Sequence, residues 1–444
     1  MTKLLITIII FISFVQINAQ DYSKIELDSL FNLFTFIRGV SVSDIRQKQV
    51  DENPELIKCG MQLVNSIKQN LDKFTFEQQQ ILFPLLQRPI TQTSTVSPNG
   101  FFRIHYDVNG NNAIGYDLNL LLQALDSVYT FEIISLGFPS PPSDDTSGGD
   151  GKYDIYVLNI VDYGYTQPEN KIADSRWSSY MVIDNDYPAG SYFTQGINAA
   201  RVTVAHEFHH AIQMGSYAPS EINSPYRNED VYFYELTSTS FEEFVFDEVN
   251  DYYAYMPSYF NHPEYAMPNQ SGYNMAIWNI YLQKNFGFNI IKRQWEHMPN
   301  KSALESIALS LRDSSTWGNE LNKFGIWTYF TNLRAVSGKY FDEAANYPLI
   351  TPTATVLFTP PSKTYDMTIA PVANYFLKIS LPSPDGVFFS IITNSDYLKT
   401  PNQTFPFAFS VFQDTVSGVR VISENYSVSF LGLYLFSVFS VQDF

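Results

Sequence analysis

The spacing of apolar residues divides the chain into regions of different character. Between about residues 23 and 86, Leu, Ile and Phe recur every three or four positions, and neither Gly nor Pro interrupts residues 61–83. This spacing is typical of amphipathic helices. A polar, Thr/Ser-rich stretch follows from Pro89 to Gly100. We therefore expect residues 20–95 to form a helical N-terminal region or a removable pro-region.

The pattern beyond this stretch combines strands and helices. Alternating or short apolar runs predict three strands, at residues 102–108, 153–160 and 179–183. Apolar residues at helical spacing predict four helices, at residues 117–128, 195–214, 231–246 and 274–285. Strands that precede long helices are typical of an α+β, zincin-like domain, which we assign to residues 96–345.

The pattern becomes β-like again from residue 346 to residue 444. Runs rich in β-branched and aromatic residues are separated by Pro, Gly, Asn and Asp, which predicts strands at residues 373–381, 387–393, 405–412 and 426–433. We expect a small all-β, sandwich-like domain here. A binding or secretion module is one interpretation of its many Phe and Tyr residues, although such residues are more often core.

The first nineteen residues have the pattern of an export signal. Lys3 precedes an apolar run from Leu4 to Val15, and Ala19 stands directly before the expected cleavage point. The run is too short to span a bilayer, which argues against a membrane anchor. We therefore expect a cleaved signal peptide at residues 1–19 and a secreted protein without stable membrane insertion.

Composition narrows the range of partners and metal sites. The formal net charge of −18 repels nucleic acid and acidic lipid surfaces, so we expect neither as a partner. Cys59 is the only cysteine, which excludes an intrachain disulfide and a cysteine-rich zinc site. A metal is therefore expected to be held by His and carboxylate groups.

The predicted helix at residues 195–214 carries the motif His206-Glu207-Phe208-His209-His210. His206 and His210 lie one helical turn apart, so both imidazoles project from one face and can bind the same Zn²⁺. Glu207 lies beside the first histidine, where it can act as general base for a zinc-activated water. His209 is expected on a different face, as a supporting or surface residue. The alternative is a solvated helix that carries His and Glu by chance, but the apolar neighbours favour the metal site.

Zinc needs a third protein ligand, and two carboxylates downstream are the main candidates. No third His follows at the metzincin spacing. Glu235 lies 25 residues after His210, which allows a second helix to cross the first, as in gluzincins. Small residues after Glu235 would let two helices approach closely, which favours it over Glu242 on the same helical face. Glu243 points away from both.

Residues from about Phe101 to Tyr255 resemble a family of predicted secreted bacterial metalloproteases first noted in myxobacteria. The resemblance covers about a third of the chain and is carried by residues 102–106, 141–144, 153–156, 179–180, 184–186, 205–213 and 250–252. It implies zinc ligands at His206 and His210, the general base at Glu207 and a ligand carboxylate at Glu235. The residues that flank this glutamate, Tyr234 and Thr237-Ser238, depart from the family pattern, so the resemblance defines the third ligand less closely than the first two.

Three weaker signals leave alternatives open. Cys59 is expected to be a small buried hydrophobe, and the alternative is a pro-region thiolate that caps the zinc and keeps an enzyme latent. The loop at residues 143–150 offers oxygen ligands for Ca²⁺, but its spacing fits a solvated turn better. A Tyr or His that stabilises the transition state is expected on another segment, and the sequence does not separate His262, Tyr252 and Tyr255.

These residues together predict an extracellular zinc endopeptidase acting on protein or peptide substrates. The intact Glu207 favours this over a secreted adhesion or binding protein with an inactive zincin fold, because metal binding alone does not need a general base. A metal-dependent amidase acting on another extracellular amide would use the same site and remains the second alternative.

Overall fold

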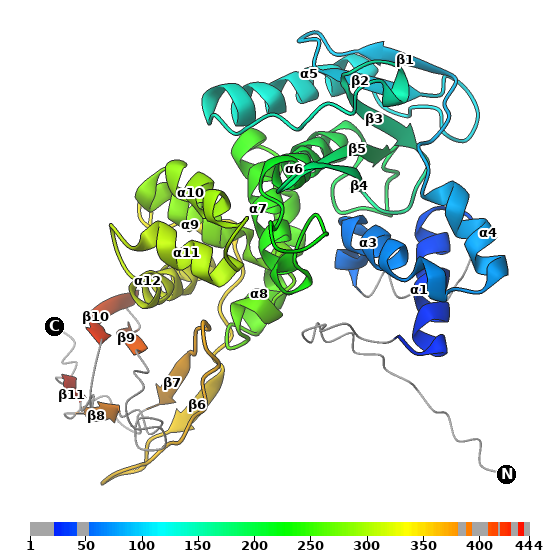
Figure 1. Cartoon of the computed structure of the whole chain (residues 1–444). Coiled ribbons are helices and arrows are strands. Elements are labelled where there is room, and N and C mark those ends of the chain that lie inside the picture. The colour runs from blue at the N-terminus through cyan, green and yellow to red at the C-terminus, as the bar shows by residue number, and fades with distance from the viewer. Residues whose placement is uncertain are drawn as a thin grey trace, which may run out of the picture.

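The computed structural model describes residues 22–41, 53–380, 388–392, 407–415, 418–427 and 434–438. This part of the chain is a mixed α+β structure with a five-stranded sheet (Figure 1). Its α-helices are α1 (Lys24–Ile37), α3 (Met61–Gln69), α4 (Phe76–Leu85), α5 (Leu118–Tyr129), α6 (Gly196–Ser216), α7 (Val231–Val245), α8 (Met256–Asn261), α9 (Ala276–Phe286), α10 (Asn289–His297), α11 (Ala303–Leu311) and α12 (Trp317–Tyr329). The expected signal peptide lies outside the described residues, and none of the described helices is long and apolar enough to cross a membrane.

The five strands lie in the order β1-β2-β3-β5-β4. β2, β3 and β5 are parallel, and the outer strands β1 and β4 each pair antiparallel with a neighbour. Their bounds are β1 (Thr93–Val96), β2 (Phe102–Tyr106), β3 (Tyr153–Leu158), β4 (Gly164–Ala173) and β5 (Arg176–Asp184). The predictions of β2, β3 and β5 are confirmed. β1 and β4 were not predicted, because β1 lies in the polar stretch and the outer half of β4 is exposed and polar.

Alternate residues of the central strands face two different helical layers. Ile155 and Met181 pack in a core with α5 and α6. Tyr156 and Val182, one position further along each strand, pack in a second core with α1, α3 and α4. The N-terminal helices therefore cover one face of the sheet, on the side opposite to α5 (Figure 1).

The N-terminal helical region contains a break that the apolar spacing did not predict. The uninterrupted pattern over residues 61–83 is divided into α3 and α4. Thr75 is the N-cap of α4. Its hydroxyl accepts a hydrogen bond from the backbone N–H of Gln78, and its own backbone N–H donates to the Gln78 side-chain oxygen. The Thr-x-x-Gln pattern of this capping box marks the start of a new helix. The prediction overlooked it because no Gly or Pro interrupts the segment.

Two buried helices cross at the centre of the molecule. Every residue of α6 from Val202 to Gly215 is buried, and so is every residue of α7 from Tyr232 to Glu243. A helix buried on all sides must find partners for its polar side chains, and the Gln213 amide donates to the Ser238 hydroxyl across the crossing, at 3.3 Å. The small residues after Glu235 therefore lie where α7 packs closely against α6, as the sequence predicted.

The C-terminal region contains six described strands in three pairs. They are β6 (Ala354–Leu357), β7 (Leu377–Ser380), β8 (Phe388–Ile392), β9 (Phe407–Thr415), β10 (Gly418–Ser427) and β11 (Tyr434–Val438). β6 pairs with β7, β8 with β11 and β9 with β10. Of the strand expected at residues 426–433, Tyr426 and Ser427 lie in β10, and residues 428–433 lie outside the described part of the chain. A sandwich-like arrangement stays a prediction.

Candidate metal centre

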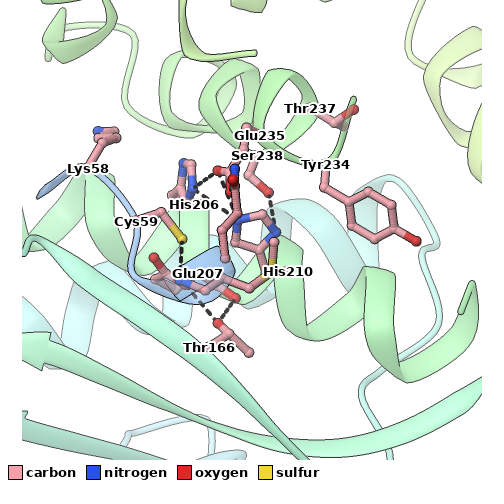
Figure 2. A network of polar contacts seen from close by, with 12 residues as sticks. Lys58, Cys59, Thr166, His206, Glu207, His210, Tyr234, Glu235, Thr237 and Ser238 are labelled. Atoms are coloured by element: carbon pink, nitrogen blue, oxygen red, sulfur yellow. Dashed lines mark hydrogen bonds and ion pairs between the residues drawn. The ribbon is translucent and has the colours of Figure 1, made fainter. Parts of the chain in front are cut away.

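Three ligand atoms meet where α6 and α7 cross (Figure 2). The Nε2 atoms of His206 and His210 are 3.1 Å apart, and Oε2 of Glu235 lies 3.1 Å from the first and 3.3 Å from the second. Ligand atoms bound to one tetrahedral zinc at about 2.0–2.1 Å lie about 3.3–3.4 Å from one another. The three atoms therefore fit three corners of a zinc tetrahedron, and all three residues are buried.

The other nitrogen of each ring is held by a hydrogen bond. Nδ1 of His206 lies 2.8 Å from Oε1 of Glu242, and Nδ1 of His210 lies 2.7 Å from Oε1 of Gln213. A proton on each Nδ1 satisfies these acceptors and leaves the Nε2 lone pairs directed at the metal position. Glu242, the rival third ligand in the sequence, thus orients His206, while Glu235 supplies the carboxylate of the ligand group.

The charges of the site favour a cation. Burial lowers the pKa of His206, but its hydrogen bonds to Glu235 and Glu242 outweigh burial and raise that pKa to about 9. Burial acts to raise the pKa of Glu235, yet the two histidines lower it to about 2. The raised pKa of His206 reflects the carboxylates of Glu235 and Glu242, and a divalent metal would supply positive charge beside the same carboxylates.

Glu207 is held at the same site by an outer strand of the sheet. The hydroxyl of Thr166 on β4 lies 2.9 Å from Oε2 of Glu207 and 2.8 Å from its main-chain oxygen. The second carboxylate oxygen, Oε1, is buried and has no hydrogen-bond partner among the described residues. Burial raises the pKa of Glu207, so its carboxylate is a stronger base than a solvated one.

Cys59 joins the three ligands from the N-terminal region. Its Sγ, the two histidines and Glu235 offer ligand atoms that all lie within 4.8 Å of one another. Within the described residues this is the only group of three or more His, Cys, Asp or Glu side chains placed to hold a metal. The expectation of a buried residue is confirmed, but its surroundings are polar: burial and then the charges of Glu207 and Glu235 raise the pKa of the thiol.

Other residues singled out from the sequence lie away from the ligands. His209 is buried rather than on the surface, and its Nδ1 lies 2.7 Å from Oε2 of Glu132. His262 pairs with Glu264 at an exposed position, and the Tyr252 hydroxyl bonds to Glu343 and Tyr347. None of these bonds reaches the ligand group.

The loop at residues 143–150, weighed as a Ca²⁺ site, has arginine partners for two of its acids. Asp144 pairs with Arg88, and Asp150 pairs with Arg103 at 2.5 Å. Calcium binding here stays a prediction without support from the described geometry.

Two tyrosines near the ligands were missed by the sequence. Tyr226 and Tyr273 are buried, and the charges of Glu235 and Cys59 contribute, after burial, to raising the pKa of each phenol. Both hydroxyls are therefore protonated donors at neutral pH. With thirty tyrosines in the chain and no motif around these two, nothing in the sequence marks them.

A protein-family model matches the part of the chain that contains α6 and α7. Residues 107–305 match a family of unknown function (DUF6055). The matched segment contains His206, Glu207, His210 and Glu235, whereas Cys59 lies before it. A search among curated proteins finds no match.

Proposed function

We propose that this protein is a secreted zinc-dependent endopeptidase of the gluzincin type. The observation that carries the proposal is the triangle of ligand atoms from His206, His210 and Glu235, with the free oxygen of Glu207 beside it. When bound, zinc supplies Lewis-acid chemistry, since it polarises a carbonyl and brings the pKa of water towards neutrality.

The remaining steps belong to side chains of this chain. Glu207 takes a proton from the attacking water at Oε1 and passes it to the leaving amine, while Thr166 holds its other oxygen. Tyr226, whose hydroxyl donates to the Met61 carbonyl at 3.4 Å in the described conformation, and Tyr273 are the candidates to donate to the substrate oxygen once residues 54–62 leave. Main-chain groups of the outer strand β4 can bind an extended peptide across the site.

The same features bear on the two alternatives. A binding protein with an inactive site does not need a buried glutamate with one oxygen free of hydrogen bonds, since such an oxygen is costly unless it is used. An amidase acting on another amide would not need a strand edge beside the metal. The geometry therefore supports peptide hydrolysis over both alternatives.

Replacing Glu207 tests the proposal directly. We expect Glu207→Gln to keep one zinc per chain and to lower kcat/KM by about 10²–10⁴-fold, because the amide cannot accept the proton. Zinc is measured by elemental analysis, and turnover by cleavage of quenched fluorescent peptides, in the wild-type chain and in a Cys59→Ser background. Glu305→Gln, at an exposed glutamate of α11, is the matched control. Retention of turnover within about threefold would overturn the role of Glu207.

A further inference from the structure

We propose that the segment Pro54–Gln62 is a built-in inhibitor in which Cys59 supplies the fourth metal ligand. Its sulfur takes the position that the reacting water needs, and two main-chain hydrogen bonds hold the flanking residues against the start of β4. The inference rests on the proposed function and names how that site is regulated. Three independent sets of contacts carry it.

The first set surrounds the sulfur. Zinc held by three protein ligands has one position left, and a fourth protein ligand closes a catalytic site into a structural one. Sγ of Cys59 lies within 4.8 Å of the three ligand atoms, and the main-chain N–H of Met61 donates to it at 3.4 Å. A bound divalent metal would supply the positive charge that favours the thiolate over the thiol, and the N–H of Met61 is already directed at the sulfur.

The second set joins the main chain of the segment to the edge of the sheet. The N–H of Tyr163 donates to the carbonyl of Ile57 at 2.7 Å, and the N–H of Gly60 donates to the carbonyl of Gly164 at 2.9 Å. These bonds lie on either side of Cys59. A side chain at residue 60 would clash with Asp162, so glycine permits the close approach. Ile57 ends a short 3-10 helix and Gly60 stands directly before α3, so the two bonds fix the short connection that carries Cys59 against the start of β4.

The third set seats the side chain of Lys58. Its Nζ lies 2.8 Å from Glu242 and 2.5 Å from Asp251, and above the rings of Tyr163 and Tyr255 at 4.7 and 5.5 Å. The lysine is buried, so two carboxylates and two aromatic faces replace its hydration. We call Glu242, Asp251, Tyr163 and Tyr255 the lysine cage. Since Glu242 also holds His206, the cage and the metal ligands share one residue.

The three sets together close the site. His206, Glu207, His210 and Glu235 are each at most 1% exposed, and the side chain of Gln62 donates to the second oxygen of Glu235 at 3.4 Å. A peptide cannot reach Glu207 while Cys59 lies there. The described conformation is therefore that of a latent enzyme, and release of residues 54–62 opens the coordination position and the strand edge together.

Cobalt substitution tests the sulfur ligand without depending on turnover. The full chain without residues 1–19 is loaded with Co²⁺, and its visible d–d bands and near-ultraviolet sulfur-to-cobalt charge-transfer band are recorded. We expect both in the wild type, and loss of the charge-transfer band alone in Cys59→Ser. Cys59→Ala, measured in the same way, guards against weak ligation by the serine hydroxyl. Peptide cleavage by the zinc form is expected to rise at least tenfold in both variants, because without the sulfur ligand residues 54–62 leave the site more often and a water then occupies the fourth position.

The outcomes separate this inference from the proposed function. Cobalt bound with d–d bands but no charge-transfer band in the wild type would overturn the inhibitor and leave the zinc site intact. A chain that binds no cobalt at all would overturn both. Charge-transfer lost in the cysteine variants together with increased cleavage would establish Cys59 as the inhibitory ligand.

Discussion

Glu235 and Glu242 lie two turns apart on α7 and contact opposite nitrogens of the same imidazole. The first is a candidate ligand, and the second fixes the ring, so their replacements should differ in degree. We expect Glu235→Ala to abolish stoichiometric zinc binding and Glu242→Gln to weaken it about 10–100-fold, as for other partners of ligand histidines. Competition with a zinc-sensitive dye measures both affinities. Glu243→Gln, next to Glu242 on α7 but outside the ligand group, is the control; equal effects of all three would contradict these roles.

Glu243 itself predicts a pH dependence of stability. Burial, followed by the nearby charges of Glu343 and Asp247, raises its pKa to about 10. Because this folded pKa exceeds the ordinary value of 4.5, the contribution to stability is complete below about pH 4.5 and is lost as pH rises through about 10.

The variant Glu243→Gln cannot ionise, so it should lack this loss. We expect its free energy of unfolding, relative to the wild type, to increase between about pH 5 and pH 9 by up to about 1.4 kcal/mol per pH unit. Urea unfolding at several pH values measures the difference. A difference that stays constant over this range would show that Glu243 ionises normally.

The sequence reached some of these residues and not others, for a physical reason. His206, Glu207 and His210 are joined by helical periodicity, and Glu235 is one helix away, so local pattern suffices. Thr166 and Tyr226 reach the site from separate segments, and so does Cys59, whose role as a cap on the zinc the sequence offered only as an alternative. Their closeness depends on how the sheet and the N-terminal helices pack, and residue spacing along the chain does not predict that packing.

At the scale of elements, a glycine sets how closely one loop approaches α7. Gly272 has a φ of +94°, and a Cβ there would meet the carbonyl of Tyr232 and, at 2.8 Å, the Cβ of Glu235. Gly272→Ala should therefore displace α7 at Glu235, the candidate ligand. We expect about 1–3 kcal/mol of lost stability from the backbone conformation, a similar loss from overpacking, and at least tenfold weaker zinc binding.

Gly287 provides a matched control on another loop. Its φ is +75°, but a Cβ there would meet nothing within 4 Å. Gly287→Ala should lose only the backbone contribution, about 1–3 kcal/mol, and keep its zinc affinity. Thermal unfolding and zinc titration of the two variants separate the effect of backbone strain at the glycine from the effect of displacing Glu235. Equal zinc affinities would show that the Gly272 contact does not position Glu235.

The elements that the sequence predicted share a feature that the missed ones lack. α5, α6, α7 and the central strands are amphipathic or wholly buried, so their apolar spacing is regular. β1 and β4 lie at the edges of the sheet, where partial exposure removes the regular pattern. The strand that lies along the metal site was therefore the hardest to find.

At the scale of the whole molecule, the lysine cage predicts a substrate preference. Departure of Lys58 leaves Glu242 and Asp251 without their buried cation, which costs about 3–5 kcal/mol for a broken buried pair. A basic substrate side chain restores the pairing. We expect peptide-library digests by the chain from which residues 54–62 have been released to be enriched in Lys or Arg at one fixed position from the cleaved bond. Mass spectrometry measures this, and cleavage without such enrichment would show that the cage is not a subsite.

The core that α1, α3 and α4 share with the sheet determines whether these helices stay bound after the chain is cut. Ile90, between these helices and β1, is 96% exposed, so a protease reaches the connection without disturbing the core. The tether gives the inhibitor an effective concentration of the order of millimolar, and cutting it turns an intramolecular equilibrium into a bimolecular one. The nicked pair stays together when it is concentrated and separates when it is diluted. For the proposed inhibitor, activation would then be a two-stage event, in which proteolysis permits release and dilution into a larger volume drives it.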